Sequence, residues 1–242
     1  MNERFALITG GGSGIGAAVA KGLLAGGYRV ISIDRQPAAT PAPGMEQVTV
    51  DLTDAVATRE AALETARRYP ITTVIHNAGA VREKPLDQVT GEDLAALTNL
   101  HVAAAISLVQ ANLATMKSQH FGRIVLVSTR AVLGLAKRTV YSATKAAMLG
   151  LARTWALELG PEGITVNVVA PGPIEATRVF HDLIPPDSPK LPGIIQSIPV
   201  RRLGRPDDVA RAILFFTAPE SGFITGQTLF VCGGTSVGSI VY

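Results

Sequence analysis

The segment Thr9-Gly10-Gly11-Gly12-Ser13-Gly14-Ile15-Gly16 decides the fold, because it joins the apolar run Phe5–Thr9 to the helix-forming run Gly14–Ala25. A short apolar run that ends at clustered glycines and leads into a helix predicts a strand, a tight turn and a helix. Glycines at such a turn let the backbone approach a pyrophosphate, which the free N–H groups at the helix N-terminus attract. An ordinary tight turn could have the same residues, so the rest of the chain must support this interpretation.

The rest of the chain alternates between two kinds of segment. We predict further strands at Arg29–Ile33, Gln47–Val50, Thr72–His76, Arg123–Val127, Ile164–Val169 and Thr228–Val231. Helices are predicted at Gly14–Ala25, Ala55–Arg68, Gly91–Gln119, Tyr141–Leu159 and Pro206–Phe216. Most of the strand runs are continuously apolar, as expected of parallel strands covered on both faces. The alternation predicts the α/β class, as a doubly wound Rossmann fold with a seven-stranded parallel sheet flanked by helices.

One crossover departs from this pattern. Between Ile33 and Gln47 the chain contains Pro37, Pro41 and Pro43, which leave little room for a helix. We therefore expect a loop in place of the helix between the second and third strands. No shift in composition marks a domain boundary, so residues 1–242 are expected to form a single domain.

Composition excludes several other classes of protein. Hydrophobic residues make up 47% of the 242 residues and charged residues 17%, which argues against disorder. The 22 basic and 19 acidic residues leave a net charge of +3 that is not concentrated in one run, so no nucleic-acid partner is expected. Cys232 is the only cysteine, which excludes an intrachain disulfide and makes the cytoplasm the expected location.

One uncharged stretch is long enough to cross a membrane. Leu94–Met116 contains no acidic residue, lysine or arginine over 23 residues. Polar side chains such as Asn99, His101 and Asn112 would make spanning costly, so we expect a buried helix and no membrane partner.

The end of the second predicted strand indicates which dinucleotide binds. Asp34 closes that strand, 18 residues after Gly16. A carboxylate there can accept hydrogen bonds from both ribose hydroxyls of NAD and would repel the 2′-phosphate of NADP. Arg35 could instead pair with that phosphate, and Asp34 could be a solvated turn residue. Because the carboxylate comes first, NAD is the favoured cofactor.

A second group of residues predicts acid–base chemistry. Tyr141 and Lys145 are four residues apart, so on a helix they share one face. An ammonium beside a phenol lowers the pKa of the phenol toward neutral pH, as a general acid–base needs. Such pairs are common on helix surfaces, but Ser128 ends the preceding strand, 13 residues before Tyr141. Ligands bind at the carboxyl ends of strands in these sheets, so the three residues are expected to form a catalytic site.

Together these residues resemble the short-chain dehydrogenase/reductase family, and the likeness covers almost the whole chain. The family's motifs stand here as Thr9–Gly16, Asn77-Ala78-Gly79, Asn99, Ser128, Tyr141-Ser142-Ala143-Thr144-Lys145 and Pro171-Gly172. The resemblance implies that Tyr141 exchanges a proton with a substrate oxygen that Ser128 stabilises. It also implies that Lys145 holds the nicotinamide ribose and that Asn99 holds a water of a proton relay.

The motifs and the resemblance together predict the cofactor contacts. Asp51 and Leu52 are expected at the adenine, and Ile174 and Thr177 at the carboxamide. The full predicted set is Gly10, Gly12, Ser13, Gly14, Ile15, Gly16, Asp34, Arg35, Asp51, Leu52, Asn77, Ala78, Gly79, Tyr141, Lys145, Pro171, Gly172, Ile174 and Thr177.

Substrate specificity is expected in the segment 175–203, which in the family forms a lid over the substrate. Its five prolines predict a stiffened loop with at most short helical turns. Within it Phe180 could offer an apolar contact and His181 could touch the substrate. A basic rim, made of Arg82, Arg130, Lys137, Arg138 and Arg178, would favour an anionic substrate. These cations could instead make structural ion pairs. The four histidines lack metal-ligand spacing, and no metal site is expected.

Three functions remain open. The favoured one is an NAD-dependent dehydrogenase that interconverts a secondary alcohol, such as a hydroxy acid, and its ketone. The second is an NADPH-dependent 3-oxoacyl thioester reductase, acting on acyl carrier protein or coenzyme A derivatives, which Asp34 and the uncharged Ser13 disfavour. The third is a non-enzymatic dinucleotide-sensing regulator, which would not need Tyr141, Lys145 and Ser128. The apolar helices predict a homotetramer or homodimer.

Overall fold

One parallel sheet runs through the molecule. The computed structural model describes residues 3–36, 41–175, 177, 180, 184–185 and 187–237. The strands are β1 (Arg4–Thr9), β2 (Tyr28–Asp34), β3 (Met45–Thr49), β4 (Ile71–His76), β5 (Gly122–Val127), β6 (Ile164–Pro171) and β7 (Thr228–Val231). They are ordered β3-β2-β1-β4-β5-β6-β7, and every neighbouring pair is parallel. The predicted seven-stranded Rossmann sheet is confirmed.

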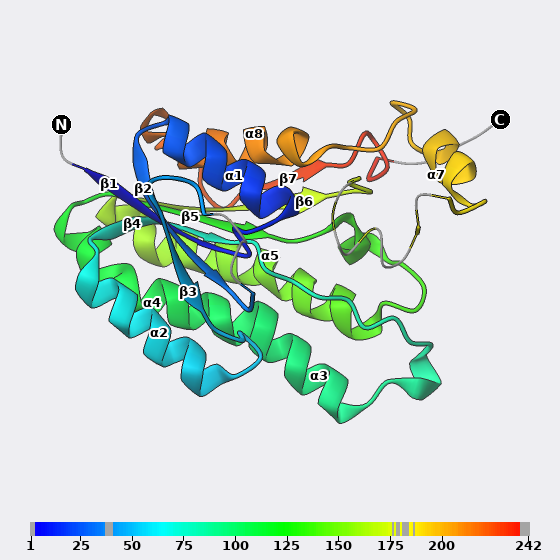
Figure 1. Cartoon of the computed structure of the whole chain (residues 1–242), viewed down its shortest axis with the longest axis horizontal. Helices are drawn as coiled ribbons and strands as arrows, with labels where there is room; N and C mark the ends of the chain where they lie inside the picture. The colour runs from blue at the N-terminus through cyan, green and yellow to red at the C-terminus, as the bar shows by residue number, and fades with distance from the viewer. Residues whose placement is uncertain are drawn as a thin grey trace.

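Helices cover both faces of this sheet (Figure 1). The main helices are α1 (Gly14–Ala25), α2 (Ala55–Arg68), α3 (Gly91–Thr98), α4 (Ala104–Ser118), α5 (Thr139–Leu159), α7 (Leu191–Ser197) and α8 (Pro206–Thr217). Single turns of 3-10 helix lie at η1 (Leu86–Gln88), η3 (Arg130–Leu133), η4 (Gly160–Glu162) and η5 (Pro219–Ser221). Helices α1 and α8 bury one apolar core against the sheet, and α2, α4 and α5 bury a second core on the opposite face.

The connection between β2 and β3 is short. Its described residues, 35–36 and 41–44, contain no helix. This agrees with the predicted loop crossover, since proline fixes φ and removes a main-chain donor. The β3 edge of the sheet is therefore more open than a helical crossover would leave it.

The long apolar helix is interrupted where the sequence predicted continuity. A π turn, η2 (Asn99–Ala103), separates α3 from α4. The whole stretch Gly91–Ser118 is long and apolar enough to cross a membrane by length and composition, and 39% of its most apolar window is buried. Leu97, Leu108 and Met116 are fully buried in the core beneath the sheet. The stretch thus occupies the position of a core helix, as predicted.

Among its described residues, the segment expected to form the lid includes the short helix α7. The seven residues of α7 lie at one end of the molecule, away from the sheet (Figure 1). Ile174 pairs with Gly204 in an isolated parallel bridge, which ties the start of this segment to its end. The segment therefore leaves the sheet and returns to it within a small area beside β6.

Candidate active site

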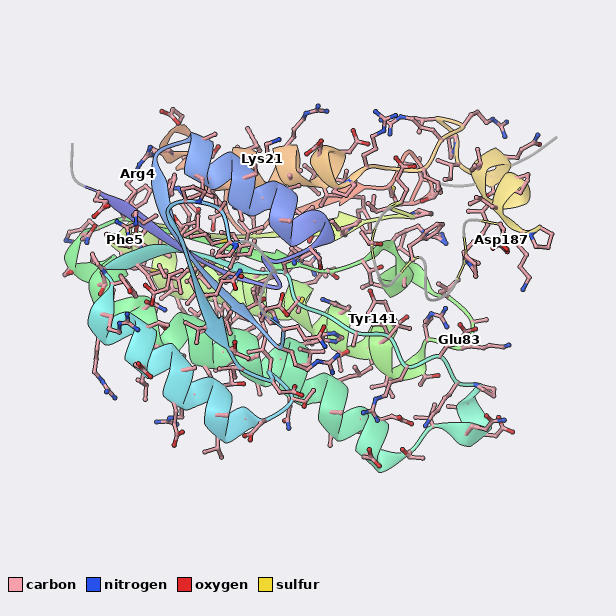
Figure 2. All side chains as sticks on the ribbon, in the orientation of Figure 1. Arg4, Phe5, Lys21, Glu83, Tyr141 and Asp187 are labelled. Atoms are coloured by element: carbon pink, nitrogen blue, oxygen red, sulfur yellow. The ribbon has the colours of Figure 1, made fainter. Side chains whose placement is uncertain are left out.

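The candidate site lies at the carboxyl ends of the strands. The strand order reverses between β1 and β4, and ligands bind at such a switch point in open α/β sheets. Figure 2 shows Tyr141, Glu83 and Asp187 at this end of the molecule, far from Arg4 and Phe5 at the opposite end. The predicted motifs therefore meet on one side of the sheet.

The glycine-rich segment forms a tight turn between β1 and α1. Gly10 and Gly14 have positive φ angles of 69° and 51°, which favour glycine. A Cβ on Gly16 would lie 1.9 Å from the carbonyl oxygen of Gly10. Within the described chain, Ser13 at the N-cap makes no side-chain capping bond, and the first turn of α1 has no acidic residue. The N–H groups of that turn can therefore bind a pyrophosphate, so the turn fits a dinucleotide.

The Asn77-Ala78-Gly79 motif braces this turn. Asn77 Nδ2 donates to the carbonyl oxygens of Thr9, at 3.1 Å, and Gly10, at 3.3 Å. Thr9 Oγ1 accepts from the main-chain N–H groups of Asn77 and Ala78. The Asn77 side chain thus shapes the glycine turn, and Ala78 lies next to Gly10 of that turn.

The predicted adenosine contacts lie at the ends of β2 and β3. Asp34 is half-buried, and among the described residues its Oδ1 accepts only a long 3.4 Å bond from Gln36 N, so the carboxylate can take a ribose hydroxyl. Asp51 Oδ1 accepts from the Thr53 main-chain N–H at 2.9 Å and hydroxyl at 2.8 Å. These bonds, with a smaller contribution from the charge of Arg35, hold the pKa of Asp51 below its usual value. Arg35 therefore lies on the adenosine side.

Leu52 differs from its predicted role in one respect. Its side chain is 4% exposed and belongs to the apolar core. Only the main chain of this residue can therefore reach a bound adenine.

Two hydrogen bonds made by Ser128 and Lys145 join the end of β5 to α5. Ser128 Oγ donates to the main-chain oxygen of Lys145 at 2.8 Å, and Lys145 Nζ donates to the oxygen of Val127 at 2.7 Å. Both side chains are almost completely buried, and burial lowers the pKa of Lys145 to about 7. These two bonds fix α5 to the carboxyl end of β5, so the predicted catalytic residues are brought together.

The pKa of Tyr141 is shifted in the opposite direction to the one predicted. Burial raises the pKa of Tyr141, although a hydrogen bond with Thr129 and the charge of Arg138 act in the opposite direction. Lys145 does not contribute to this balance, since its Nζ points to Val127 O. The predicted lowering of the Tyr141 pKa by Lys145 is therefore wrong for this arrangement.

Asn99 is the first residue of the π turn. Its Nδ2 donates to the carbonyl oxygen of Thr53 at 3.0 Å. Because Thr53 also bonds to Asp51, the side chain connects the helix to the adenosine side. The predicted water-holding role of Asn99 stays a prediction.

The segment after β6 holds the remaining predicted cofactor contacts. Pro171 ends β6, and Gly172 N donates to Val231 O at 3.0 Å. The Thr177 hydroxyl donates to the carbonyl oxygen of Ile174 at 2.9 Å. This bond joins Thr177 to Ile174, and a carboxamide contact from either residue stays a prediction.

The structure corrects the prediction of a basic rim at Arg138 and Arg82. Arg138 is 7% exposed, and its Nη2 donates to Glu83 Oε2 at 3.0 Å, so it is a buried structural cation instead of a substrate residue. Arg82 pairs with the buried Asp93 at 2.9 Å. Glu83 is 55 residues from Arg138 in the sequence and Asp93 is 11 residues from Arg82, and neither separation is a helical spacing that would have predicted the pair.

The four other predicted substrate residues have different outcomes. Arg130 is half-buried in η3 and forms no ion pair with any described residue. Phe180 is half-buried, and its N–H donates to Thr177 O at 3.0 Å. Arg178 and His181 lie outside the described residues. Arg130 is thus the candidate that the structure leaves available for an anionic group.

His101 was not among the residues predicted for the site. This fully buried histidine lies two residues after Asn99, with its ring at 5.8 Å and 71° from that of Tyr141. The one signal in the sequence was its position two residues after the motif residue Asn99. The surrounding residues are mostly apolar, which indicated a core helix and not a site residue.

Comparisons with known proteins cover nearly the whole chain. A family model described as enoyl-(acyl carrier protein) reductase matches residues 10–236. Acetoacetyl-CoA reductase from Shinella zoogloeoides is 34% identical over 240 residues, which cover 96% of this chain and 98% of that protein. The 3-oxoacyl-[acyl-carrier-protein] reductase MabA from Mycobacterium bovis is 32% identical over 241 residues, covering 98% and 94%. A gluconate 5-dehydrogenase from Burkholderia cenocepacia, solved with NADP and tartrate, has a TM-score of 0.89 at 29% identity, covering 98% and 97%.

Proposed function

The chain belongs to the short-chain dehydrogenase/reductase family, and from this premise we propose that it reduces 3-oxoacyl thioesters to 3-hydroxyacyl thioesters. It is an oxidoreductase of CH–OH groups that uses a nicotinamide dinucleotide. One observation carries the finer proposal: two relatives aligned over nearly the whole chain act by name on 3-oxoacyl thioesters. They favour this reaction over the NAD-dependent dehydrogenation of a simple alcohol or hydroxy acid, the function favoured on sequence grounds.

The geometry of the site suits the reductive direction. When bound, the reduced cofactor supplies the hydride to the carbonyl carbon. Tyr141 then donates the proton to the carbonyl oxygen, and its raised pKa keeps the phenol protonated at neutral pH. Ser128 must exchange its bond to Lys145 O for one to the substrate oxygen, by rotation of its hydroxyl. The chain's residues thus hold the oxygen and provide the proton.

The proposed function is tested by following nicotinamide absorbance. We expect purified protein to oxidise NADPH with acetoacetyl-CoA, and to accept a 3-oxoacyl chain on acyl carrier protein at a kcat/KM that shows which carrier is preferred. Neutral secondary alcohols and hydroxy acids with NAD are the comparison panel. A higher kcat/KM for any member of that panel than for the thioesters would contradict the proposal.

For the cofactor we infer that both dinucleotides are accepted and that NADP(H) is preferred. The NADP held by the Burkholderia relative supports this and weighs against the sequence prediction of NAD. In this chain the exposed guanidinium of Arg35 can pair with a 2′-phosphate. The carboxylate of Asp34 opposes it, which limits the preference.

Two single variants separate these charges. Asp34→Ala is expected to raise the ratio of kcat/KM for NADPH over NADH roughly tenfold or more, because it removes a like charge and an acceptor for the ribose hydroxyls of NADH. Arg35→Ala is expected to lower the same ratio by roughly tenfold. The ratio is measured with one thioester at fixed salt. A ratio that moves in the same direction in both variants would contradict the assignment.

Assembly stays a prediction. A groove of about 200 Å³ between α4 and α5 is lined by apolar residues including Ile106, Leu113 and Trp155. Leu157 on α5 is 82% exposed. Both features support a homo-oligomer that covers these helices.

A further inference from the structure

His101 contacts three residues, which lie in two separate parts of the candidate site. Its Nδ1 is 2.9 Å from the hydroxyl of Thr144, the residue before Lys145 on α5. Its Nε2 accepts from the main-chain N–H of Ala80, at 3.3 Å, in the turn that follows β4. Its ring meets that of Tyr141 edge to face at 5.8 Å. No other described histidine bonds to both the turn and α5.

These bonds fix one tautomer. A main-chain N–H can only donate, so Nε2 must be unprotonated to accept from Ala80. In a neutral imidazole the proton is then on Nδ1, which donates to Thr144 Oγ1. The Thr144 hydroxyl can in turn donate to Val140 O, at 2.9 Å. The ring therefore completes a chain of bonds from the turn at Ala80 to the first turns of α5.

The turn that His101 holds is next to Lys145. A Cβ on Gly79 would lie 3.1 Å from Lys145 Nζ and 3.3 Å from His101 Nε2, so both nitrogens face this glycine. Burial and the charge of Lys145 hold the pKa of His101 well below its usual value, so the ring is neutral. A neutral ring can keep both bonds at the pH values at which the site works.

The π turn explains why the ring reaches this position. One extra residue in the turn rotates the following side chains by about 100° relative to a regular α-helix. Asn99 then bonds to Thr53 O, and His101 points to Ala80 and Thr144. The π turn thus directs two polar side chains, two residues apart, into two different parts of the site.

We propose that His101 is a positioning residue that couples the Gly79–Ala80 turn, on the cofactor side, to the helix that carries Tyr141 and Lys145. The bond to Ala80 sets the place of the turn next to Lys145, the residue expected to hold the nicotinamide ribose. The bond to Thr144 and the ring contact set the orientation of Tyr141. The role rests on the proposed function for its effect on turnover, whereas its effect on cofactor binding does not.

The two bonds can be removed separately. The amide of His101→Asn reaches the place of Nδ1 and keeps the bond to Thr144, and the amide of His101→Gln reaches the place of Nε2 and keeps an acceptor for Ala80. We expect His101→Asn to weaken the cofactor Kd roughly tenfold with a smaller change in kcat. We expect His101→Gln to lower kcat roughly tenfold with little change in Kd. His101→Phe keeps the ring but loses both bonds, and should show both effects.

The measurements are the cofactor Kd from nucleotide fluorescence, kcat at saturating cofactor, and the thermal unfolding midpoint. Thr144→Val removes the acceptor from the other side, so it should reproduce the kcat loss of His101→Gln and add nothing in the double variant. Equal losses of Kd and kcat in the Asn and Gln variants would overturn the proposal, as would folded variants that all remain within twofold of the natural chain. If His101→Phe does not fold, the Asn and Gln variants decide. If the protein reduces no thioester, the proposed function fails, but the cofactor Kd of each variant still tests the role of His101.

Discussion

Replacing Tyr141 with Phe is expected to lower kcat for thioester reduction about 10³-fold while the cofactor Kd stays within about twofold. In the proposed reaction the phenol is the proton donor, and its bond to Thr129 and ring contact to His101 fix its direction. Phe keeps the ring and its packing and loses only the hydroxyl. A residual kcat above about a tenth of the natural value would assign the proton transfer to another group.

The pH profile gives a second readout of the same residue. Reduction needs the protonated phenol, so its kcat should be constant through neutral pH and fall only above the raised pKa of Tyr141. Oxidation of the 3-hydroxyacyl product needs the phenolate, so its kcat should rise with pH toward the same limit. Arg138 and His101 act on the phenol or contact its ring. A step near pH 7 would instead report Lys145 on the same helix, whose pKa is about 7. Stopped assays in both directions separate the two outcomes.

Gly16→Ala is expected to lower cofactor affinity on the order of 10²-fold and to destabilise the fold by about 3 kcal/mol. The added carbon would lie 1.9 Å from Gly10 O and 2.8 Å from Asn77 Nδ2. The first of these atoms belongs to the main chain, so no rotamer change relieves the clash. The glycine turn must move away from α1, and the N–H groups that bind the pyrophosphate move with it.

A matched glycine provides the control for this variant. Gly91 begins α3, is exposed, and an added carbon there would meet nothing within 4 Å. Gly91→Ala should change the free energy of unfolding by less than about 1 kcal/mol and leave the cofactor Kd unchanged. Chemical denaturation and nucleotide fluorescence measure both quantities. Equal effects of the two substitutions would show that the close approach at Gly16 is unimportant.

Much of the fold was predictable because its signals are local. Helices α1 and α2 have the predicted bounds, Gly14–Ala25 and Ala55–Arg68, and the prolines after Asp34 indicated the loop crossover. The π turn at Asn99–Ala103 was not predicted. The extra residue of the π turn changes the direction of the side chains that follow it, but it leaves the apolar composition of the stretch unbroken. The sequence pattern therefore gives no sign of the turn.

The site was predictable only where a strand end or a helical spacing brings residues together. Ser128 and Lys145 follow from such spacing. The ion pair between Arg138 and Glu83 joins loops 55 residues apart, and composition could not tell it from a cation available to substrate. The direction in which the Tyr141 pKa shifts depends on burial and on where Lys145 Nζ points. Neither can be predicted from the four-residue spacing between Tyr141 and Lys145.

The bond between Thr9 and His76 also bears on how the chain folds. It joins residues 67 positions apart, across the β1–β4 pairing. An N-terminal piece that ends after β3 would contain the whole glycine motif but none of the groups of β4 and its motif that brace it. Pairing over such a separation requires the closure of a long loop, a slow step in folding. The turn can therefore reach its braced form only after β4 has joined β1, and we expect a nascent chain to gain dinucleotide affinity late.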